Sequence, residues 1–174
     1  SGHTFATDGD VEPILHLYED EGTECFQHLN GMFAIAIWDA NRNRCVLARD
    51  RIGQKPLYYS VKNNQLVFGS ELKSLAAVDG ICEEIDPAAI DEFLTYQYIP
   101  HPGTIWKGVR KLAPGHFAIF ENGEFIEKRP WVIYTDGINL TEVMNMPEVN
   151  ASTTFSNDIH EIYENLGIEA ARYA

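Results

Sequence analysis

The sequence predicts an α+β fold in which antiparallel sheets are layered with helices. A strand at residues 32–39 carries apolar side chains on both of its faces, which is typical of a central strand covered by two layers. Further strands at 45–48, 57–59 and 65–68 are separated by short polar turns, which favours antiparallel pairing between neighbours. An apolar period of three to four residues in 11–18 predicts a helix packed on the sheet.

Four helices and a last hairpin complete the expected fold of residues 1–131. The first helix follows Asp10, whose carboxylate is a suitable N-cap, and it ends at Gly22. A short second helix is expected through Cys25 and Leu29 and closes at Gly31. A third is expected at 72–77, and a fourth begins at Asp86, which a proline follows. The hairpin at 116–126 turns on an Asn-Gly pair, a favoured two-residue turn. The apolar stripe of the fourth helix consists of Ile90, Phe93 and Leu94.

Charge and hydropathy exclude two classes of function. The net charge is −13 over 174 residues, whereas a surface that binds DNA or RNA needs clustered Lys and Arg. No apolar run approaches the ~20 residues of a membrane span, and the first residues lack the features of a signal peptide. We therefore expect a cytoplasmic protein that contacts neither nucleic acid nor membrane.

The cysteines and histidines do not suggest a metal site or a bound cofactor. Cys25, Cys45 and Cys82 are too widely spaced for a zinc site or a disulfide framework. Cys25 and Cys45 stand among apolar residues and are expected in the core. His16 and His160 lie in predicted helices and are interpreted as surface or packing residues. No metal and no cofactor are therefore expected.

Four motifs in residues 1–131 carry a resemblance to a known family. They read GMFAIAIWD at 31–39, ARDRIGQKPLYY at 48–59, FGSELKSL at 68–75 and GVRKLAPGH at 108–116. In this order they resemble the glutaminase domain of class II glutamine amidotransferases, above all that of glutamine-dependent asparagine synthetase. The resemblance implies an N-terminal-nucleophile fold, in which two antiparallel sheets lie between helix layers (αββα).

The resemblance also implies a reaction and one site residue. The family hydrolyses the side-chain amide of glutamine with a cysteine at its mature N-terminus. That cysteine, and the family's oxyanion donors, lie upstream of the position that matches Ser1. We therefore expect a truncated, partial domain with no catalytic residue, inactive by itself. Asp10 matches the acid that holds the substrate's α-amino group, although capping of the helix is an alternative role for it.

Charged residues next to these motifs are expected to be structural. Residues 49–51 (Arg-Asp-Arg) are interpreted as an ion network, and so is the pair Glu71 and Lys73. Because strand 32–39 is apolar on both faces while the family's flanking strands lie upstream, unpaired sheet edges predict self-association. The alternative is that residues 132–174 fold back over the opening.

The composition changes near Trp131. Residues 132–174 hold seven acidic residues and a single Arg. The motifs WVIYTDGINL at 131–140 and SNDIHEIYENLGIEAAR at 156–172 resemble a late segment of the largest subunit of RNA polymerases. The resemblance implies a structural segment. The capping-box-like start at 139–142 and the apolar period of 159–166 predict that this appendage is mainly helical. Two alternatives to a glutaminase-type chain therefore remain: an RNA polymerase-related structural segment, or a recombined or designed chimera without activity.

Overall fold

The structure is a computed structural model that describes residues 2–128, 134–135 and 138–139. The chain divides into two compact units, unit 1 (Ser1–Trp131) and unit 2 (Val132–Ala174). In unit 2, β8 (Tyr134–Thr135) and β9 (Ile138–Asn139) pair antiparallel. The predicted helical appendage and the polymerase-like motifs otherwise lie outside the described residues.

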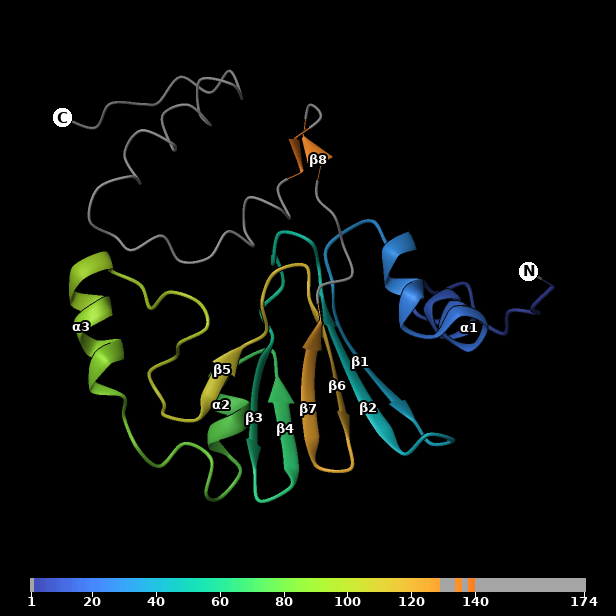
Figure 1. The fold of residues 1–174 in the computed structure, drawn as a ribbon. Helices are drawn as coiled ribbons and strands as arrows, with labels where there is room; N and C mark the ends of the chain where they lie inside the picture. Colours follow the sequence, from blue (N-terminus) through green and yellow to red (C-terminus); the bar gives the residue numbers. More distant parts are fainter. Residues whose placement is uncertain (1, 129–133, 136–137, 140–174) are drawn as a thin grey trace. The chain divides into compact units, whose positions relative to one another are not determined.

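Unit 1 contains two antiparallel sheets, which Figure 1 shows together with their helices. The strand order is β1-β2-β6-β7 in the first sheet and β4-β3-β5 in the second. The strands are β1 (Ala34–Asp39), β2 (Arg44–Arg49), β3 (Tyr58–Lys62), β4 (Gln65–Gly69), β5 (Val109–Lys111), β6 (Phe117–Glu121) and β7 (Glu124–Lys128). The helices are α1 (Glu12–Glu21), the 3₁₀-helix η1 (Gly22–His28), α2 (Leu72–Ala76) and α3 (Pro87–Tyr96).

Three apolar clusters lie between successive layers of unit 1. The first joins Phe26 of η1 to Val46 of β2, between the N-terminal helices and the first sheet. The second joins Leu47 of β2 to Tyr59 of β3, between the two sheets. The third packs Leu75 of α2 against the second sheet. The order of layers is therefore helix, sheet, sheet, helix, which agrees with the expected αββα arrangement.

The doubly covered strand is β2 and not β1. Val46 belongs to the cluster on the helix side and Leu47 to the cluster between the sheets, so alternate side chains of β2 enter different cores. β1 pairs with β2 and forms one end of the sheet, where Trp38 is 62% exposed. The prediction that residues 32–39 form a central strand was wrong, because the second sheet packs mainly on β2, β6 and β7. Among the described residues, β1 adds Ala34 alone to that cluster.

The ends of two helices test the predicted capping residues. α1 begins one residue later than expected, with Val11 in the N-cap position and no side-chain cap, so Asp10 does not cap it. Gly22 ends α1 with φ 63°, as predicted. α3 begins as predicted, because the Asp86 carboxylate accepts a hydrogen bond from the N–H of Ala88 at 3.0 Å.

The apolar stripe of α3 is not buried in unit 1. Ile90, Phe93 and Leu94 are all exposed, and the helix buries Ala89 instead. The periodicity correctly predicted the helix but not its buried face, because no described layer covers the stripe. Strand β5 was missed altogether, since three residues are too short for a period-two pattern.

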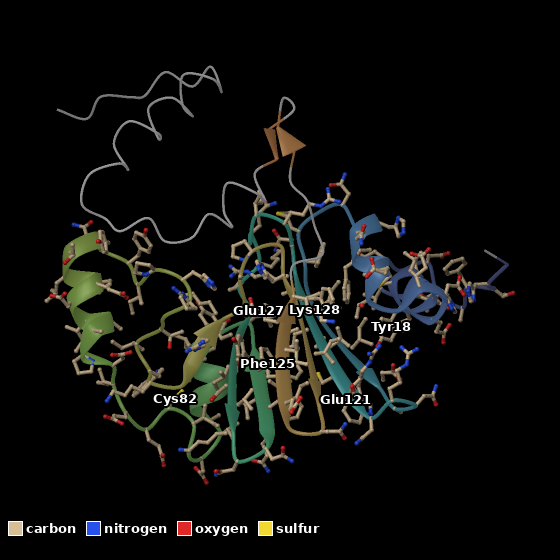
Figure 2. The ribbon with its side chains drawn as sticks, viewed as in Figure 1. Tyr18, Cys82, Glu121, Phe125, Glu127 and Lys128 are labelled. Atoms are coloured by element: carbon tan, nitrogen blue, oxygen red, sulfur yellow. The ribbon has the colours of Figure 1, made fainter. Side chains whose placement is uncertain are left out.

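The hairpin of β6 and β7 agrees with its prediction. Asn122 and Gly123 have φ of 51° and 83°, the positive values that a two-residue hairpin turn requires. Phe125 of β7, which is labelled in Figure 2, stacks on Tyr59 of β3 with ring centroids 4.3 Å apart. This contact packs the hairpin against the second sheet.

No helix in the described part of the chain combines the length and the apolarity that crossing a membrane requires. The cytoplasmic location stays a prediction.

Candidate functional site

The segment in front of α1 is held in place by one carboxylate. Glu12 accepts hydrogen bonds from the N–H of Ala6 at 2.7 Å and from Thr7, whose N–H lies at 2.7 Å and whose hydroxyl lies at 2.6 Å. These bonds, that of Ala6 first and that of the Thr7 hydroxyl next, lower the pKa of Glu12 to about 2. The ionised carboxylate also lies in the first turn of α1, where the helix dipole favours negative charge. Residues 6–12 therefore form a closed loop at the start of the helix.

Asp10 lies in this loop, next to Val11 at the start of α1. Its side chain is exposed, and it makes no hydrogen bond or ion pair to any described residue. The role as a helix cap is excluded, so the carboxylate is available to a ligand. Sequence reasoning missed Glu12, the residue that shapes this loop. An acid in the first turn of a helix was the available signal.

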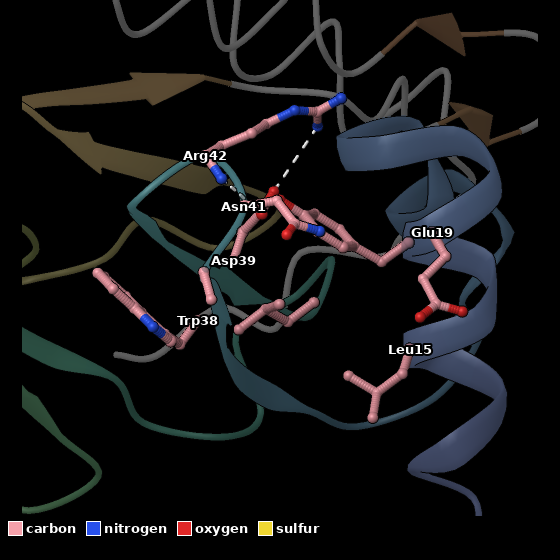
Figure 3. A pocket seen from close by; sticks show the side chains of 9 residues that line it. Leu15, Glu19, Trp38, Asp39, Asn41 and Arg42 are labelled. Carbon is pink, nitrogen blue, oxygen red and sulfur yellow. Dashed lines mark hydrogen bonds and ion pairs between the residues drawn. The ribbon is translucent and has the colours of Figure 1, made fainter.

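The pocket between α1 and the turn that joins β1 to β2 has a volume of about 510 Å³ (Figure 3). Asp10 does not line it. Its central carboxylate, Asp39, accepts a hydrogen bond from the Tyr18 hydroxyl at 3.0 Å and another from the N–H of Arg42 at 3.0 Å. Arg44 lies 3.4 Å from the same carboxylate and donates to the Tyr18 oxygen at 2.8 Å. These polar groups bind one another. The side chains around Asp39 are therefore held in place by contacts within the protein.

Residues 49–51 do not form the predicted ion network. The side chain of Asp50 is fully buried. Asp50 and Arg49 both bind backbone N–H or carbonyl groups of neighbouring loops, which would otherwise lack a hydrogen-bond partner. The partners are the N–H groups of Gln54 and Lys55 for Asp50, and the carbonyl oxygens of Gly53, Lys55 and Leu112 for Arg49. The other predicted pair is present. Lys73 Nζ lies 2.5 Å from Glu71 Oε2, and both side chains are exposed.

None of the three cysteines has the surroundings of a nucleophile. Cys25 and Cys45 are buried, as predicted, and Cys82 is partly buried. Burial raises the pKa of all three thiols. For Cys25 the pKa reaches about 11, with the charges of Glu21 and Glu24 adding to the effect. Because the thiolate is the reactive form, these cysteines are expected to be inert.

The comparison with protein families agrees with the fold and the motifs. A family model described as a glutamine amidotransferase domain matches residues 1–132. The chain belongs to this glutamine amidotransferase family. The expected family of the first segment is thereby confirmed.

Several curated relatives of this amidotransferase domain are asparagine synthetases. Asparagine synthetase [glutamine-hydrolyzing] 3 of Bacillus subtilis is 32% identical, over 92% of this chain and 24% of its own length. A putative asparagine synthetase of Mycobacterium tuberculosis is 42% identical, over 67% of this chain and 18% of its own. The chain thus spans about a quarter or less of these relatives. The first match is longer than unit 1 and therefore includes part of unit 2.

A solved structure supports the fold. Glutamine phosphoribosylpyrophosphate amidotransferase from Bacillus subtilis matches with a TM-score of 0.52 and 20% identity, over 75% of this chain and 24% of that one. At this identity the likeness concerns the fold alone, and it agrees with the two antiparallel sheets of unit 1.

Proposed function

We propose that this chain recognises glutamine for an asparagine synthetase-type amidotransferase and does not hydrolyse glutamine by itself. The family match and the asparagine synthetase relatives support the first part. The surroundings of the cysteines support the second part. Burial raises the pKa of all three thiols, so the chain offers no activated thiolate for attack on an amide.

Asp10 is the proposed contact for the α-amino group of glutamine. An ammonium group pairs well with a carboxylate, through charge-assisted hydrogen bonds that a neutral amide cannot form. Asp10 is exposed and without a protein partner in the described residues, so no internal bond must be broken before a ligand binds. The loop closed by Glu12 gives this carboxylate a fixed place at the start of α1.

The inactivity is tested by measuring ammonia release from glutamine. We expect no release above the background of buffer with glutamine. Release that disappears on a Cys25→Ser, Cys45→Ser or Cys82→Ser substitution would show that one of these thiols is a nucleophile after all. The proposal of inactivity would then be wrong.

Recognition by Asp10 is tested separately. Glutamine is titrated into the isotope-labelled chain, and the NMR chemical shifts of the backbone amides are followed. Asp10→Asn removes the charge and keeps the shape, so we expect glutamine affinity to fall at least about tenfold. Asp8→Asn is the matched control, since Asp8 is an exposed acid of the same loop. Equal affinities in both variants and the parent would contradict the role of Asp10.

The alternative readings concern unit 2. Apart from β8 and β9, the polymerase-like motifs lie outside the described residues. None of the comparisons above bears on a relation to RNA polymerase, so a polymerase-related structural role stays a prediction. The same holds for a recombined or designed origin of the chain. The Bacillus subtilis synthetase match, which reaches into unit 2, favours the amidotransferase reading for the chain as a whole.

A further inference from the structure

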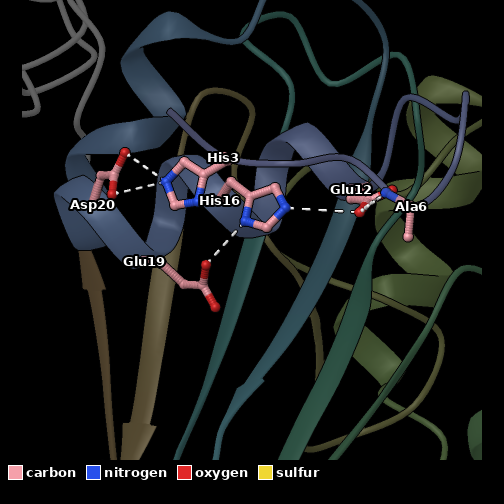
Figure 4. A network of polar contacts seen from close by, with 6 residues as sticks. All are labelled: His3, Ala6, Glu12, His16, Glu19 and Asp20. Carbon is pink, nitrogen blue, oxygen red and sulfur yellow. Dashed lines mark hydrogen bonds and ion pairs between the residues drawn. The ribbon is translucent and has the colours of Figure 1, made fainter. Parts of the chain in front are cut away.

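Two histidines and a glutamate meet where the N-terminal segment crosses α1 (Figure 4). His3 comes from the segment, whereas His16 and Glu19 stand one turn apart on the helix. One ligand atom from each of the three lies within 4.8 Å of the others. The two imidazole rings are stacked, with centroids 4.3 Å apart, and their side chains are only 24% and 22% exposed.

Each ring turns one of its nitrogens toward a carboxylate. His3 Nε2 lies 3.0 and 3.1 Å from the two oxygens of Asp20. His16 Nε2 lies 3.7 Å from a Glu12 oxygen and is buried without a hydrogen-bond partner. A carboxylate on the outer nitrogen is the usual second contact of a metal-binding histidine, because it fixes the tautomer and leaves the other nitrogen as a ligand.

We propose that His3 Nδ1, His16 Nδ1 and the Glu19 carboxylate bind a divalent transition metal ion of the zinc class. Two imidazole nitrogens and one carboxylate suit zinc, nickel or copper, whereas calcium and magnesium prefer oxygen ligands alone. His16 Nδ1 and Glu19 Oε2 are already 3.0 Å apart. Two ligands about 2 Å from a tetrahedral ion lie roughly 3.3 Å from each other. Water completes the coordination.

Metal binding also accounts for the unpaired atom of His16. An ion on Nδ1 places the imidazole proton on Nε2, which then becomes a donor facing the Glu12 carboxylate. The ion replaces the hydrogen bond between His16 and Glu19. The site links the N-terminal segment to α1, and so fixes the loop that carries Asp10. The sequence favoured a packing role for His16, and the stacked rings agree with that role in the metal-free chain. A metal ion lies in the plane of each imidazole that binds it, so at least one ring must rotate out of the stack when the ion binds.

The test is a titration of the full 174-residue chain with Zn²⁺ by calorimetry, and with Co²⁺ by absorption spectroscopy. We expect one ion per chain with a micromolar dissociation constant, and a Co²⁺ spectrum of four-coordinate type. Asp20→Asn should weaken Zn²⁺ binding about tenfold, as loss of a second contact does in other sites. His3→Ala and His16→Ala should weaken it further.

His28→Ala is the matched control, because His28 also pairs with a carboxylate, Glu21 at 2.8 Å, but belongs to no metal-binding cluster in the described part of the chain. It should leave Zn²⁺ affinity unchanged. Glu19→Gln guards against misfolding, since Glu19 is exposed and its loss should weaken binding without changing the circular dichroism spectrum. No binding at 100-fold excess of Zn²⁺ over chain, or equal affinity in the parent and in Glu19→Gln, would overturn the proposal.

Discussion

At the scale of single residues, buried charged side chains in unit 1 form hydrogen bonds to backbone groups. The Asp50 carboxylate is fully buried and accepts the N–H groups of Gln54 and Lys55, each at 2.9 Å. Burial by itself raises the pKa of Asp50, but the hydrogen bonds from Lys55, Gln54 and further backbone groups outweigh it, and the pKa lies below its ordinary value. The ionised form is therefore the one that holds the loop after β2.

The first prediction is that Asp50→Asn destabilises the chain by about 2 kcal/mol or more at neutral pH, because an amide nitrogen would face backbone donors. The folded-state pKa is lowered, so the stability from Asp50 is present above the ordinary carboxyl range and is lost as pH falls through the folded pKa. The difference between parent and variant should thus shrink on acidification below pH ~3.8. Urea unfolding at several pH values measures it.

Asp91→Asn serves as the control for this experiment. Asp91 is exposed on α3, and its replacement should change the free energy of unfolding by less than about 0.5 kcal/mol. A pH-independent loss in Asp50→Asn would contradict the role of the ionised carboxylate.

At the scale of elements, the loop between β2 and β3 depends on a glycine. Gly53 has φ 68°, and a Cβ there would lie 2.8 Å from Pro114 Cγ and 3.1 Å from Arg49 Cζ. Gly108 has a similar φ of 75° with nothing within 4 Å of its would-be Cβ. A side chain at either position would strain the backbone, because φ is positive at both. Only at Gly53 would the added Cβ also lie too close to neighbouring atoms.

The second prediction compares these two glycines. Gly108→Ala should destabilise by about 1 kcal/mol through its positive φ alone. Gly53→Ala should destabilise by about 1–3 kcal/mol more, because the added methyl group displaces Pro114 and the Arg49 guanidinium. Thermal or urea unfolding of both variants measures the difference. Equal losses would mean that the loop yields without strain.

The third prediction concerns the free edge of β1. Ala36 and Trp38 are exposed on one face of a strand that pairs with β2 alone among the described strands. We expect the chain to form dimers or larger assemblies through this edge. Ala36→Lys and Trp38→Glu should shift light scattering toward monomer. Ile52→Glu, which replaces another exposed apolar residue outside β1, should not.

An alternative to self-association is that residues 132–174 cover the same surface. A chain that ends at Trp131 should then aggregate, whereas an edge-paired dimer should survive the truncation. A monodisperse monomer both with and without residues 132–174 would contradict both explanations.

At the scale of the whole molecule, the net charge determines whether the chain can bind nucleic acids. The net charge of −13 repels polyanions, and residues 132–174 contribute only Arg172 as a fixed positive charge. The fourth prediction is that the chain binds neither DNA nor RNA at physiological salt. Fluorescence anisotropy of labelled oligonucleotides should not change on titration. A micromolar dissociation constant that weakens steeply with added salt would contradict it.

Local rules in the sequence were sufficient for the start and end of several elements. Gly22 ends α1, Asp86 caps α3, and Asn122-Gly123 turns the last hairpin. Each of these depends on the backbone preferences of a few consecutive residues, which short-range sterics and hydrogen bonds determine. The motifs along residues 1–131 likewise predicted the family, which the match over 1–132 confirms.

Tertiary structure alone decided which apolar faces are covered and which distant polar groups meet. The pattern of residues 32–39 predicted a central strand, yet β2 occupies that place, because the extent of the second sheet determines burial. His3 reaches His16 because Glu12 binds the backbone of Ala6 and Thr7 and folds the N-terminal segment back. The alternation and periodicity of apolar residues determine which faces of a strand or helix are apolar. Which other segment covers such a face depends on packing between parts far apart in the chain.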